Sequence, residues 1–470
     1  MYKSATMTIR RAGAVLWAAV IASACATSSP RPALEAPPPH ARGSVLELGA
    51  DARAAPTVEA TRLDVLPTGE VSLAQVLTWA DRHSPLLLVA RSTRSRAEAA
   101  RVGAAILQQA NPEVSVAVGP RFGIFGIGVD VEANVSQQLQ IAGERGLRLD
   151  AARRLRELTD AEIEQIRWAV HGEVHAGFHR VLVARERVRL AEQVVAFQAE
   201  VLRVVERQAH AGTSAPFTAR LAQAEVAQAR QSLVGAQQDE TAALIRLSVV
   251  AGWPAASPPS LRGSLDPPQD PPTAAQLQEA AERHTPVLRT REAAVREAAS
   301  RVAVADREAW PRPSIGVQYR REGNPTSEGP YDTMMGMLSV PIPGFQRNQG
   351  ERARARADLE VAEAELAAAR TQLLGQLAEA RSVMAAAAQR TRAYGTEILP
   401  RFAENLTLLR RSFELGEIDM LALLIGRERF LRIQSDALAA QLDYFVALAA
   451  LERLVGIELW RDDHHEGDHP

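Results

Sequence analysis

The pattern of apolar and polar residues changes from a strand period to a helix period near Gly143. From Ile127 to Ile141 apolar and polar residues alternate, which is typical of a strand with one apolar and one polar face. After Gly143 apolar residues recur every three to four positions, or at multiples of that spacing, as far as about His210. No proline interrupts this run before Pro216, and about 65 helical residues would extend about 100 Å. Such a helix is far longer than a usual globular helix and indicates a coiled coil or a tube.

Short motifs recur in the same order and indicate that the chain is a tandem duplication. His83-Ser84-Pro85 returns as His284-Thr285-Pro286, at an offset of 284 − 83 = 201. Gly212 returns as Gly416, at an offset of 416 − 212 = 204, and Val250-Ala251-Gly252 returns as Leu454-Val455-Gly456 at the same offset. We therefore expect two structural repeats, at residues 70–260 and 273–460, joined by a proline-rich connector at 261–272.

Each repeat is predicted to contain a helix, a strand, a turn, a second strand, a very long helix, a turn and a return helix. The first repeat is expected to have a helix at 72–110 that Pro85 kinks or divides, strands at 113–119 and 127–141 around a turn at 120–126, and a return helix ending near 250. The second is expected to have a helix ending near 310, strands at 314–320 and 334–342 around a loop at 323–332, a long helix at 350–414 broken or kinked near Pro400, and a return helix ending near 455.

The first residues have the features of an export signal. Two arginines precede a short apolar segment, and the small residues Ala22-Ser23-Ala24 stand before Cys25, the only cysteine of the chain. We expect residues 1–24 to be a signal peptide and Cys25 to carry a covalent lipid in a bacterial lipoprotein, which makes residues 25–69 a lipid-anchored N-terminus and linker. The alternative is an ordinary signal peptide followed by an incidental cysteine.

Composition restricts the classes of function. The chain is 23% charged with a net charge of −2, which does not describe a nucleic-acid binder, and its 4% of aromatic residues suits thin, alanine-rich helix packing. No apolar run after the signal peptide is long enough for a transmembrane helix, so any membrane crossing must use strands. The strands of one chain would leave unpaired edges in lipid, and a membrane location therefore requires several chains that share one barrel.

Two groups of histidines have spacings that suit metal binding. Side chains four residues apart lie on one helix face and can hold one zinc ion, although a polar seam is the commoner explanation; these are His171, His175 and His179. Residues 461–470 form an acidic, histidine-containing tail, which either is disordered or binds divalent cations; its histidines are His464, His465 and His469.

The polar face of the strand at 127–141 carries acidic residues. If this face lines a channel, Asp130 and Glu132 would favour cations in its lumen. We find no Walker-type glycine loop, nucleophile elbow or paired-cysteine motif in the sequence. We therefore predict that the protein is not an enzyme and that it needs no cofactor besides the expected lipid.

The duplicated plan, the two glycine-centred helix tips and one further segment resemble the TolC family of outer-membrane efflux proteins. That segment, Pro341-Ile342-Pro343-Gly344-Phe345-Gln346-Arg347-Asn348-Gln349-Gly350, is similar to the corresponding stretch of the branch that exports heavy-metal cations, the CzcC-like branch. The resemblance covers about residues 70–460. It implies a mainly α fold with a small β part, in which a long coiled-coil helical barrel joins four strands per chain.

The resemblance also implies an assembly and a location. Three chains of four strands each would close a twelve-stranded β-barrel in the cell outer membrane, with most of each chain in the periplasm. The homotrimer would meet a periplasmic adaptor protein and an inner-membrane pump of the resistance-nodulation-division type. It would passively conduct the substrate that this pump expels, which in this branch is a heavy-metal cation.

The helix tips are the sites at which the resemblance places the periplasmic entrance and the adaptor. The alternative is that they are ordinary reversals that need glycine. The candidate docking residues of the first repeat are Arg207, Gly212, Thr213 and Ser214, and those of the second, at an offset of 204, are Arg411, Gly416, Glu417 and Ile418.

Other functions fit parts of the same pattern. An efflux duct for drugs, other organic solutes or a secreted polypeptide would have the same fold, because the partner pump sets much of the choice. A periplasmic adaptor also has a coiled-coil hairpin and an N-terminal anchor, and a structural coiled-coil protein would explain the helices alone. The duplicated strands argue against the adaptor, and the alternating strand at 127–141 argues against the structural protein.

Overall fold

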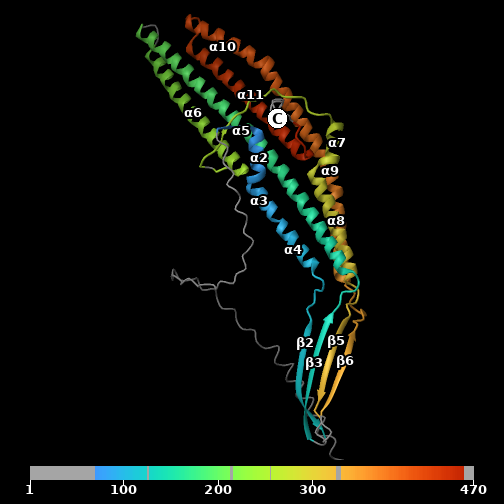
Figure 1. The fold of residues 1–470 in the computed structure, drawn as a ribbon. Coiled ribbons are helices and arrows are strands. Elements are labelled where there is room, and N and C mark those ends of the chain that lie inside the picture. The colour runs from blue at the N-terminus through green and yellow to red at the C-terminus, as the bar shows by residue number, and fades with distance from the viewer. Residues whose placement is uncertain (1–68, 124–125, 212–214, 255, 324–329, 460–470) are drawn as a thin grey trace, which may run out of the picture. The chain divides into compact units, whose positions relative to one another are not determined.

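The computed structural model describes residues 69–459 except 124–125, 212–214, 255 and 324–329. These residues belong to one unit that begins at Pro67 and that consists of long helices and a four-stranded sheet (Figure 1). None of its described helices has the length and the apolar character that crossing a membrane would require. The expected signal peptide, Cys25, the linker and the tail with His464, His465 and His469 lie outside the described residues.

The first repeat begins with a short strand and three short helices. Its elements are β1 (Glu70–Val71), α2 (Leu73–His83), α3 (Pro85–Ser92), α4 (Arg94–Ala105), β2 (Glu113–Gly123), β3 (Gly126–Gln138), α5 (Glu144–His210) and α6 (Pro216–Ala251). β4 (Ser260–Leu261) lies where the first repeat meets the connector, and it pairs in parallel with β1.

The second repeat has the same order of main elements. They are α7 (Ala274–His284), α8 (Pro286–Arg307), β5 (Ser314–Glu322), β6 (Tyr331–Ser339), α9 (Gln349–Ala393), the π-helix η1 (Tyr394–Ile398), α10 (Leu399–Glu414) and α11 (Met420–Val455). The predicted plan of two strands followed by a long helix and a return helix is therefore confirmed in both repeats.

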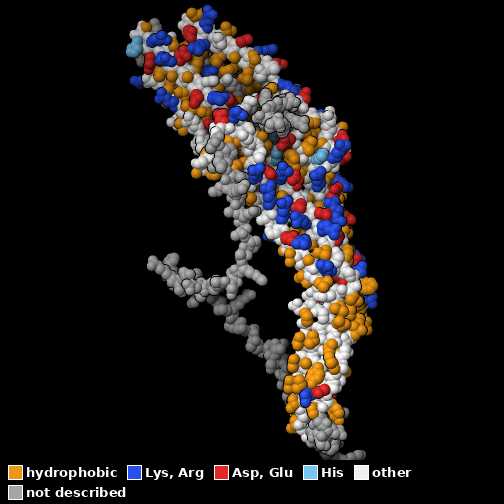
Figure 2. Space-filling model, in the orientation of Figure 1, with side chains coloured by type: hydrophobic (Ala, Val, Ile, Leu, Met, Phe, Trp, Pro, Cys, Tyr) orange, Lys and Arg blue, Asp and Glu red, His pale blue; other side chains and the backbone are white. Residues whose placement is uncertain are grey.

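The sheet joins the two repeats through their strands. Its order is β2-β3-β5-β6 and all three pairings are antiparallel, so β2 and β6 are its edges. Val116, Ala133, Tyr319 and Met334 stand in one row across the four strands, on the apolar face. This face is open to solvent in the single chain, with Val116 66% and Met334 76% exposed. Figure 2 shows hydrophobic side chains gathered over the sheet, whereas charged side chains cover much of the helical part.

The predicted long helix is present as α5, with 67 residues. Gly143 precedes it with φ of 79°, a left-handed conformation that suits glycine. Its apolar stripe is buried against neighbouring helices, and Val174, Val181 and Val205 are fully covered. Because α5 contacts α6 of its own repeat and α8 and α11 of the other, it holds the two repeats together.

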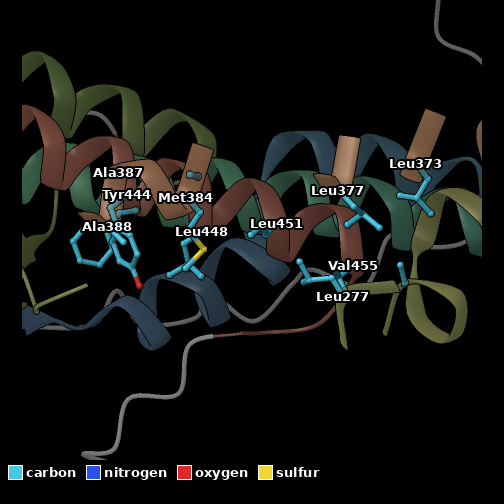
Figure 3. Close-up of a cluster of buried hydrophobic side chains, with 13 residues drawn as sticks. Leu277, Leu373, Leu377, Met384, Ala387, Ala388, Tyr444, Leu448, Leu451 and Val455 are labelled. Carbon is cyan, nitrogen blue, oxygen red and sulfur yellow. The ribbon is translucent and has the colours of Figure 1, made fainter. Parts of the chain in front are cut away.

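A buried cluster holds α11 against α9 and α7 (Figure 3). Tyr444, Leu448, Leu451 and Val455 lie on successive turns of α11 and form one stripe of this cluster. Burying a side chain such as Leu448 stabilises the fold by about 1.5–3 kcal/mol. The Tyr444 hydroxyl accepts a hydrogen bond from the Gln269 amide at 3.0 Å, so the connector is attached to the same helix.

Two of the three motifs that indicated the duplication contact each other in each repeat. Gly252 ends α6 with φ of 74°, and a Cβ at that position would lie 2.0 Å from the His83 carbonyl oxygen. Gly456 ends α11 with φ of 78°, and its Cβ would lie 2.7 Å from the His284 carbonyl oxygen. Each return helix therefore ends against the turn between the first two helices of its own repeat.

The helix predicted at 72–110, kinked or divided by Pro85, ends earlier than expected and has one further interruption. It is divided at Ser84, as Pro85 suggested, because a residue before proline favours extended backbone, and Ser84 has ψ of 126°. A second interruption separates α3 from α4 at Thr93, and α4 ends at Ala105. The helix predicted to end near 310 is likewise divided before Pro286 and ends at Arg307.

The strand boundaries also differ from the prediction. Residues 120–123 were expected in a turn, but β2 continues to Gly123, and Phe122 stands opposite Ile127. The strand tolerates Pro120 because β2 is an edge strand of the sheet, where a missing backbone N–H need not remove a hydrogen bond between strands. β3 ends at Gln138, short of Ile141.

In the second repeat, β6 is shifted towards the N-terminus relative to the predicted 334–342. It begins at Tyr331, within the residues expected in the loop, and ends at Ser339, before Pro341. Met335 and Met337 fall on the polar face, opposite Gln318 and Gly316, as the weak alternation of this strand indicated.

The predicted break of the second long helix near Pro400 is confirmed. The α9 helix passes into a five-residue π-helix, and α10 begins at Leu399 with the proline in its first turn. Proline cannot donate the backbone hydrogen bond of a helix interior and its ring clashes with the preceding turn, which accounts for the irregular segment.

Candidate functional site

The end of α5 and the tip of the second hairpin pack together through a small apolar cluster. Its buried members come from α5, α6, α10 and α11, and they are Val201, Val205, Ala222, Phe413 and Leu423. The predicted tip residue Ile418 packs against this cluster and is half-buried. The structure therefore brings the end of α5, with Arg207, next to the second tip, with both Arg207 and Arg411 exposed.

The second tip is built around Gly416. This glycine has φ of 76°, and its N–H donates to the Phe413 carbonyl at 3.0 Å, while the Glu417 N–H donates to the Ser412 carbonyl at 2.9 Å. These are the two hydrogen bonds of a Schellman motif, which ends a helix at a left-handed residue. Asp419 then accepts from the Ala422 N–H at 2.9 Å and caps α11. The corresponding predicted residues of the first tip, Gly212, Thr213 and Ser214, lie outside the described residues.

The polar face of the sheet carries a network of ion pairs around the two predicted acidic residues. Arg121 lies 3.0 Å from Asp130 and 2.9 Å from Glu322, and Arg320 lies 3.1 Å from Glu132. Asp130 also accepts a hydrogen bond from the Gly323 amide, and Gln318 donates to Glu132. The prediction that Asp130 and Glu132 share the polar face is confirmed, but sequence reasoning did not identify their arginine partners.

A histidine cluster lies where α5 meets α11. His175 Nδ1 lies 2.9 Å from Glu452 Oε2, and His171 Nε2 lies 3.4 Å from the same oxygen. The side chains of His175 and Glu452 are almost completely buried, whereas that of His171 is 14% exposed. Within the described part of the chain, these three residues form a group whose ligand atoms all lie within 4.8 Å of one another.

The third predicted histidine points elsewhere. The His179 ring stacks on Phe445 with centroids 3.8 Å apart, and its Nδ1 lies 3.0 Å from the His175 carbonyl oxygen. Burial, together with the nearby His175, lowers the pKa of His179 to about 3, so its ring is neutral near pH 7. The structure therefore groups two of the three predicted histidines and separates the third.

Glu452 is a candidate ligand that sequence reasoning missed. Burial raises the pKa of its carboxyl group, but the contacts with His171 and His175 outweigh this effect and lower the pKa to about 2. Gly172 permits the close approach of the two helices, because a Cβ there would lie 3.2 Å from the Ala449 carbonyl oxygen. The one feature of the sequence that could have indicated this contact is a glycine next to a histidine in a long helix. That feature does not identify the helix that supplies the carboxylate.

Comparison with known proteins assigns the chain to a family. The family model described as "Outer membrane efflux protein" matches residues 82–252 and 277–457, which correspond to the two repeats. The cobalt-zinc-cadmium resistance protein CzcC of Cupriavidus metallidurans is 24% identical over 326 residues, which cover 69% of this chain and 76% of that protein. The nickel-cobalt-cadmium resistance protein NccC of Alcaligenes xylosoxydans xylosoxydans is 29% identical over 253 residues, which cover 52% of this chain and 56% of that protein.

Solved structures share the fold. The CmeC outer membrane channel of Campylobacter jejuni has a TM-score of 0.65 at 13% identity, covering 83% of this chain and 87% of that one. The CusC structure has a TM-score of 0.64 at 16% identity, covering 84% of this chain and 96% of that one. Since the family model matches both repeats and most of the chain, the protein belongs to the outer membrane efflux protein family.

Proposed function

We propose that this protein is the outer-membrane channel of a tripartite efflux system, in which it passively conducts a substrate expelled by an inner-membrane pump. The observation that carries the proposal is the four-stranded sheet with two open edges and an exposed apolar face, which continues into a helix of 67 residues. Family membership favours this function over a periplasmic adaptor or a structural coiled-coil protein, and the family and fold are those of efflux channels rather than enzymes.

The open edges support a homotrimer. In a bilayer each unpaired backbone group on β2 and β6 would cost several kcal/mol, so the sheet of one chain has to continue into the sheets of others. Three chains with four strands each give twelve strands, which lies within the range of bacterial outer-membrane barrels. The exposed apolar face would then contact lipid, and the polar face with its ion pairs would line the lumen.

Heavy-metal cations are the substrates we propose. The similar proteins CzcC and NccC are named for resistance to cobalt, cadmium and either zinc or nickel. The polar face also has an acidic excess, because its network contains three carboxylates, Asp130, Glu132 and Glu322, and two guanidinium groups, Arg121 and Arg320. A lumen with a net negative charge attracts cations.

The proposed trimer also implies protein partners in the periplasm and a lipid anchor in the outer membrane. A periplasmic adaptor would dock at the helix tips, where Arg207 and Arg411 are exposed, and would connect the trimer to a pump of the resistance-nodulation-division type. The protein is located in the outer membrane, as its family indicates, and a lipid on Cys25 would attach each chain there in addition to the barrel.

Conductance in a planar bilayer, measured together with the mass of the detergent-extracted protein, tests the proposal. We expect discrete, cation-selective current steps from a particle with the mass of three chains. A monomer without conductance would refute the shared barrel. A trimer that conducts without preferring cations would support the duct but contradict the proposal that metal cations are its substrates. Organic solutes would then be the favoured substrates.

A further inference from the structure

The cluster of His171, His175 and Glu452 lies apart from the helix tips and the sheet, and none of the proposed duct functions uses it. We propose that these three residues bind one divalent transition-metal cation of the zinc type, and that the bound ion fastens α5 of the first repeat to α11 of the second. This inference does not rest on the proposed function, because the site lies in the packing between two helices of one chain.

The distances between the ligand atoms suit a single ion. In a tetrahedral zinc site with bonds of about 2.0–2.1 Å, neighbouring ligand atoms lie about 3.3 Å apart. The two imidazole nitrogens stand 3.4 and 2.9 Å from Glu452 Oε2, close to this value. All ligand atoms lie within 4.8 Å of one another, so at most a small rotation of a histidine side chain is needed to bring both nitrogens within the roughly 4.2 Å that two bonds to one ion can span. His175 Nδ1 and Glu452 Oε2 are both buried, and in the structure they form an ion pair whose two atoms are the ones that would bind the cation.

The donor set is one that zinc uses in proteins. His171 and His175 are four residues apart on one helix, the spacing that directs two imidazoles towards one ion, and Glu452 completes a set of two histidines and one carboxylate. Three protein ligands leave the fourth position of a tetrahedral ion for water. The partial exposure of His171 gives a route by which the ion and this water can reach the site.

The surrounding residues hold the ligands in place. The Leu459 amide donates to Glu452 Oε1 at 2.9 Å, which fixes the carboxylate and leaves Oε2 directed to the histidines. The Trp168 ring lies 4.9 Å from the His171 ring, and the His179 ring lies 4.9 Å from the His175 ring. His179 supports the site in this way without being a ligand, since its ring stacks on Phe445.

Binding of Zn²⁺ to the purified full-length protein tests the proposal. Every sample carries His464→Ala, His465→Ala and His469→Ala, which remove the imidazoles of the tail, and is stripped of metal with a chelator. Titration calorimetry should then show one Zn²⁺ per chain, and Co²⁺ should give the visible absorption of a tetrahedral site. Zn²⁺ should also raise the midpoint of thermal unfolding.

Variants of the ligands distinguish this site from others. Substituting a residue that only holds a metal ligand in place typically weakens metal affinity by about 10- to 100-fold. Loss of a ligand itself should have a larger effect, so His171→Ala and Glu452→Gln should each weaken binding by at least about 100-fold. His210→Ala removes an exposed histidine from the same helix and should leave binding unchanged. Absence of Zn²⁺ binding by the unmutated cluster would overturn the proposal, as would tight binding that persists in either ligand variant.

Discussion

At the scale of single residues, the ion pairs on the polar face of the sheet provide a test of cation selectivity. Replacing both predicted acids, Asp130→Asn and Glu132→Gln, changes the charge of the five-residue network from 2 − 3 = −1 to 2 − 1 = +1. Because the arginines would then face the lumen with one carboxylate between them, we expect the double variant to lose its preference for cations. Reversal potentials of single channels in a salt gradient measure this change.

A control separates the effect of position from that of a lost ion pair. Asp160→Asn removes a carboxylate that lies 2.8 Å from Arg94 in the helical part, and it should leave the reversal potential unchanged. An unchanged cation preference in the double variant would show that the network around Asp130 and Glu132 does not control selectivity.

Cys25 provides a second prediction at this scale. If the residue is lipidated, Cys25→Ser should abolish incorporation of a fatty-acid analogue, because the thiol is the acceptor of the lipid. Labelling of cells that express either protein, followed by purification, measures the incorporation. Equal labelling of the two proteins would refute lipidation at this position.

The histidine cluster shows what residue spacing can predict. The four-residue spacing of His171 and His175 placed both on one helix face, and in the structure both lie beside one carboxylate, which the spacing did not predict. The same spacing included His179, which instead stacks on Phe445. Spacing along a helix does not say which partner helix covers each turn, and Glu452 lies in the other repeat, more than 270 residues away.

At the scale of elements, the contact between each return helix and its first turn is a stabilising feature of both repeats. Gly252→Ala would place a methyl group 2.0 Å from the His83 carbonyl oxygen and would also force alanine into a left-handed conformation. We expect the free energy of unfolding to fall by about 2–5 kcal/mol, since the conformation alone costs about 1–2 kcal/mol and the overlap adds to it. Chemical denaturation in detergent measures the difference.

Gly416→Ala is the matched control for this substitution. Gly416 has nearly the same φ, 76° against 74°, but a Cβ there meets no atom of the described chain within 4 Å. It should therefore cost only about 1–2 kcal/mol, the conformational part. Equal losses in the two variants would mean that the contact with His83 does not stabilise the repeat.

The second tip supports a prediction about docking. A large residue at Gly416, such as Gly416→Trp, would project from the end of the hairpin, where adaptor docking is proposed, and should abolish efflux in cells. Gly416→Ala carries the same backbone strain with a small side chain and should retain most of the activity. Metal resistance of cells, compared with the amount of trimer, measures the effect. Normal resistance with the tryptophan variant would refute docking at this tip.

The elements themselves differ in how far the sequence predicts them. The long helix α5 follows directly from its apolar period and its lack of proline, and both ends agree with the prediction. The extent of β2 does not follow from the sequence in this way. Glycine and proline at 119–120 resemble a turn, but proline is tolerated in an edge strand. Whether a strand is an edge depends on the order of the whole sheet, which short motifs do not encode.

At the scale of the whole molecule, the duplication made the fold predictable. Each repeat has strands with one apolar face and a helix too long for a globular core, and the family match confirms the resulting architecture. The position of the repeats against each other was not predictable in the same way. It depends on contacts of α5 with α8 and α11, which no local period reveals.

The apolar face of the sheet gives the last prediction, which concerns insertion of the assembled protein into the membrane. Val116 and Ser115 are neighbours in β2 and point to opposite faces, since Val116 stands opposite Ala133 and Ser115 opposite Asn134. If the apolar face contacts lipid, Val116→Arg should destabilise the inserted protein by about 2–4 kcal/mol per chain near the bilayer centre. Ser115→Arg would place the same charge in the lumen, so it should insert normally and conduct fewer cations. Outer-membrane fractionation with quantification of the trimer measures insertion for both variants. Equal insertion of the two would refute the assignment of the faces, and with it the barrel that three such sheets are proposed to form.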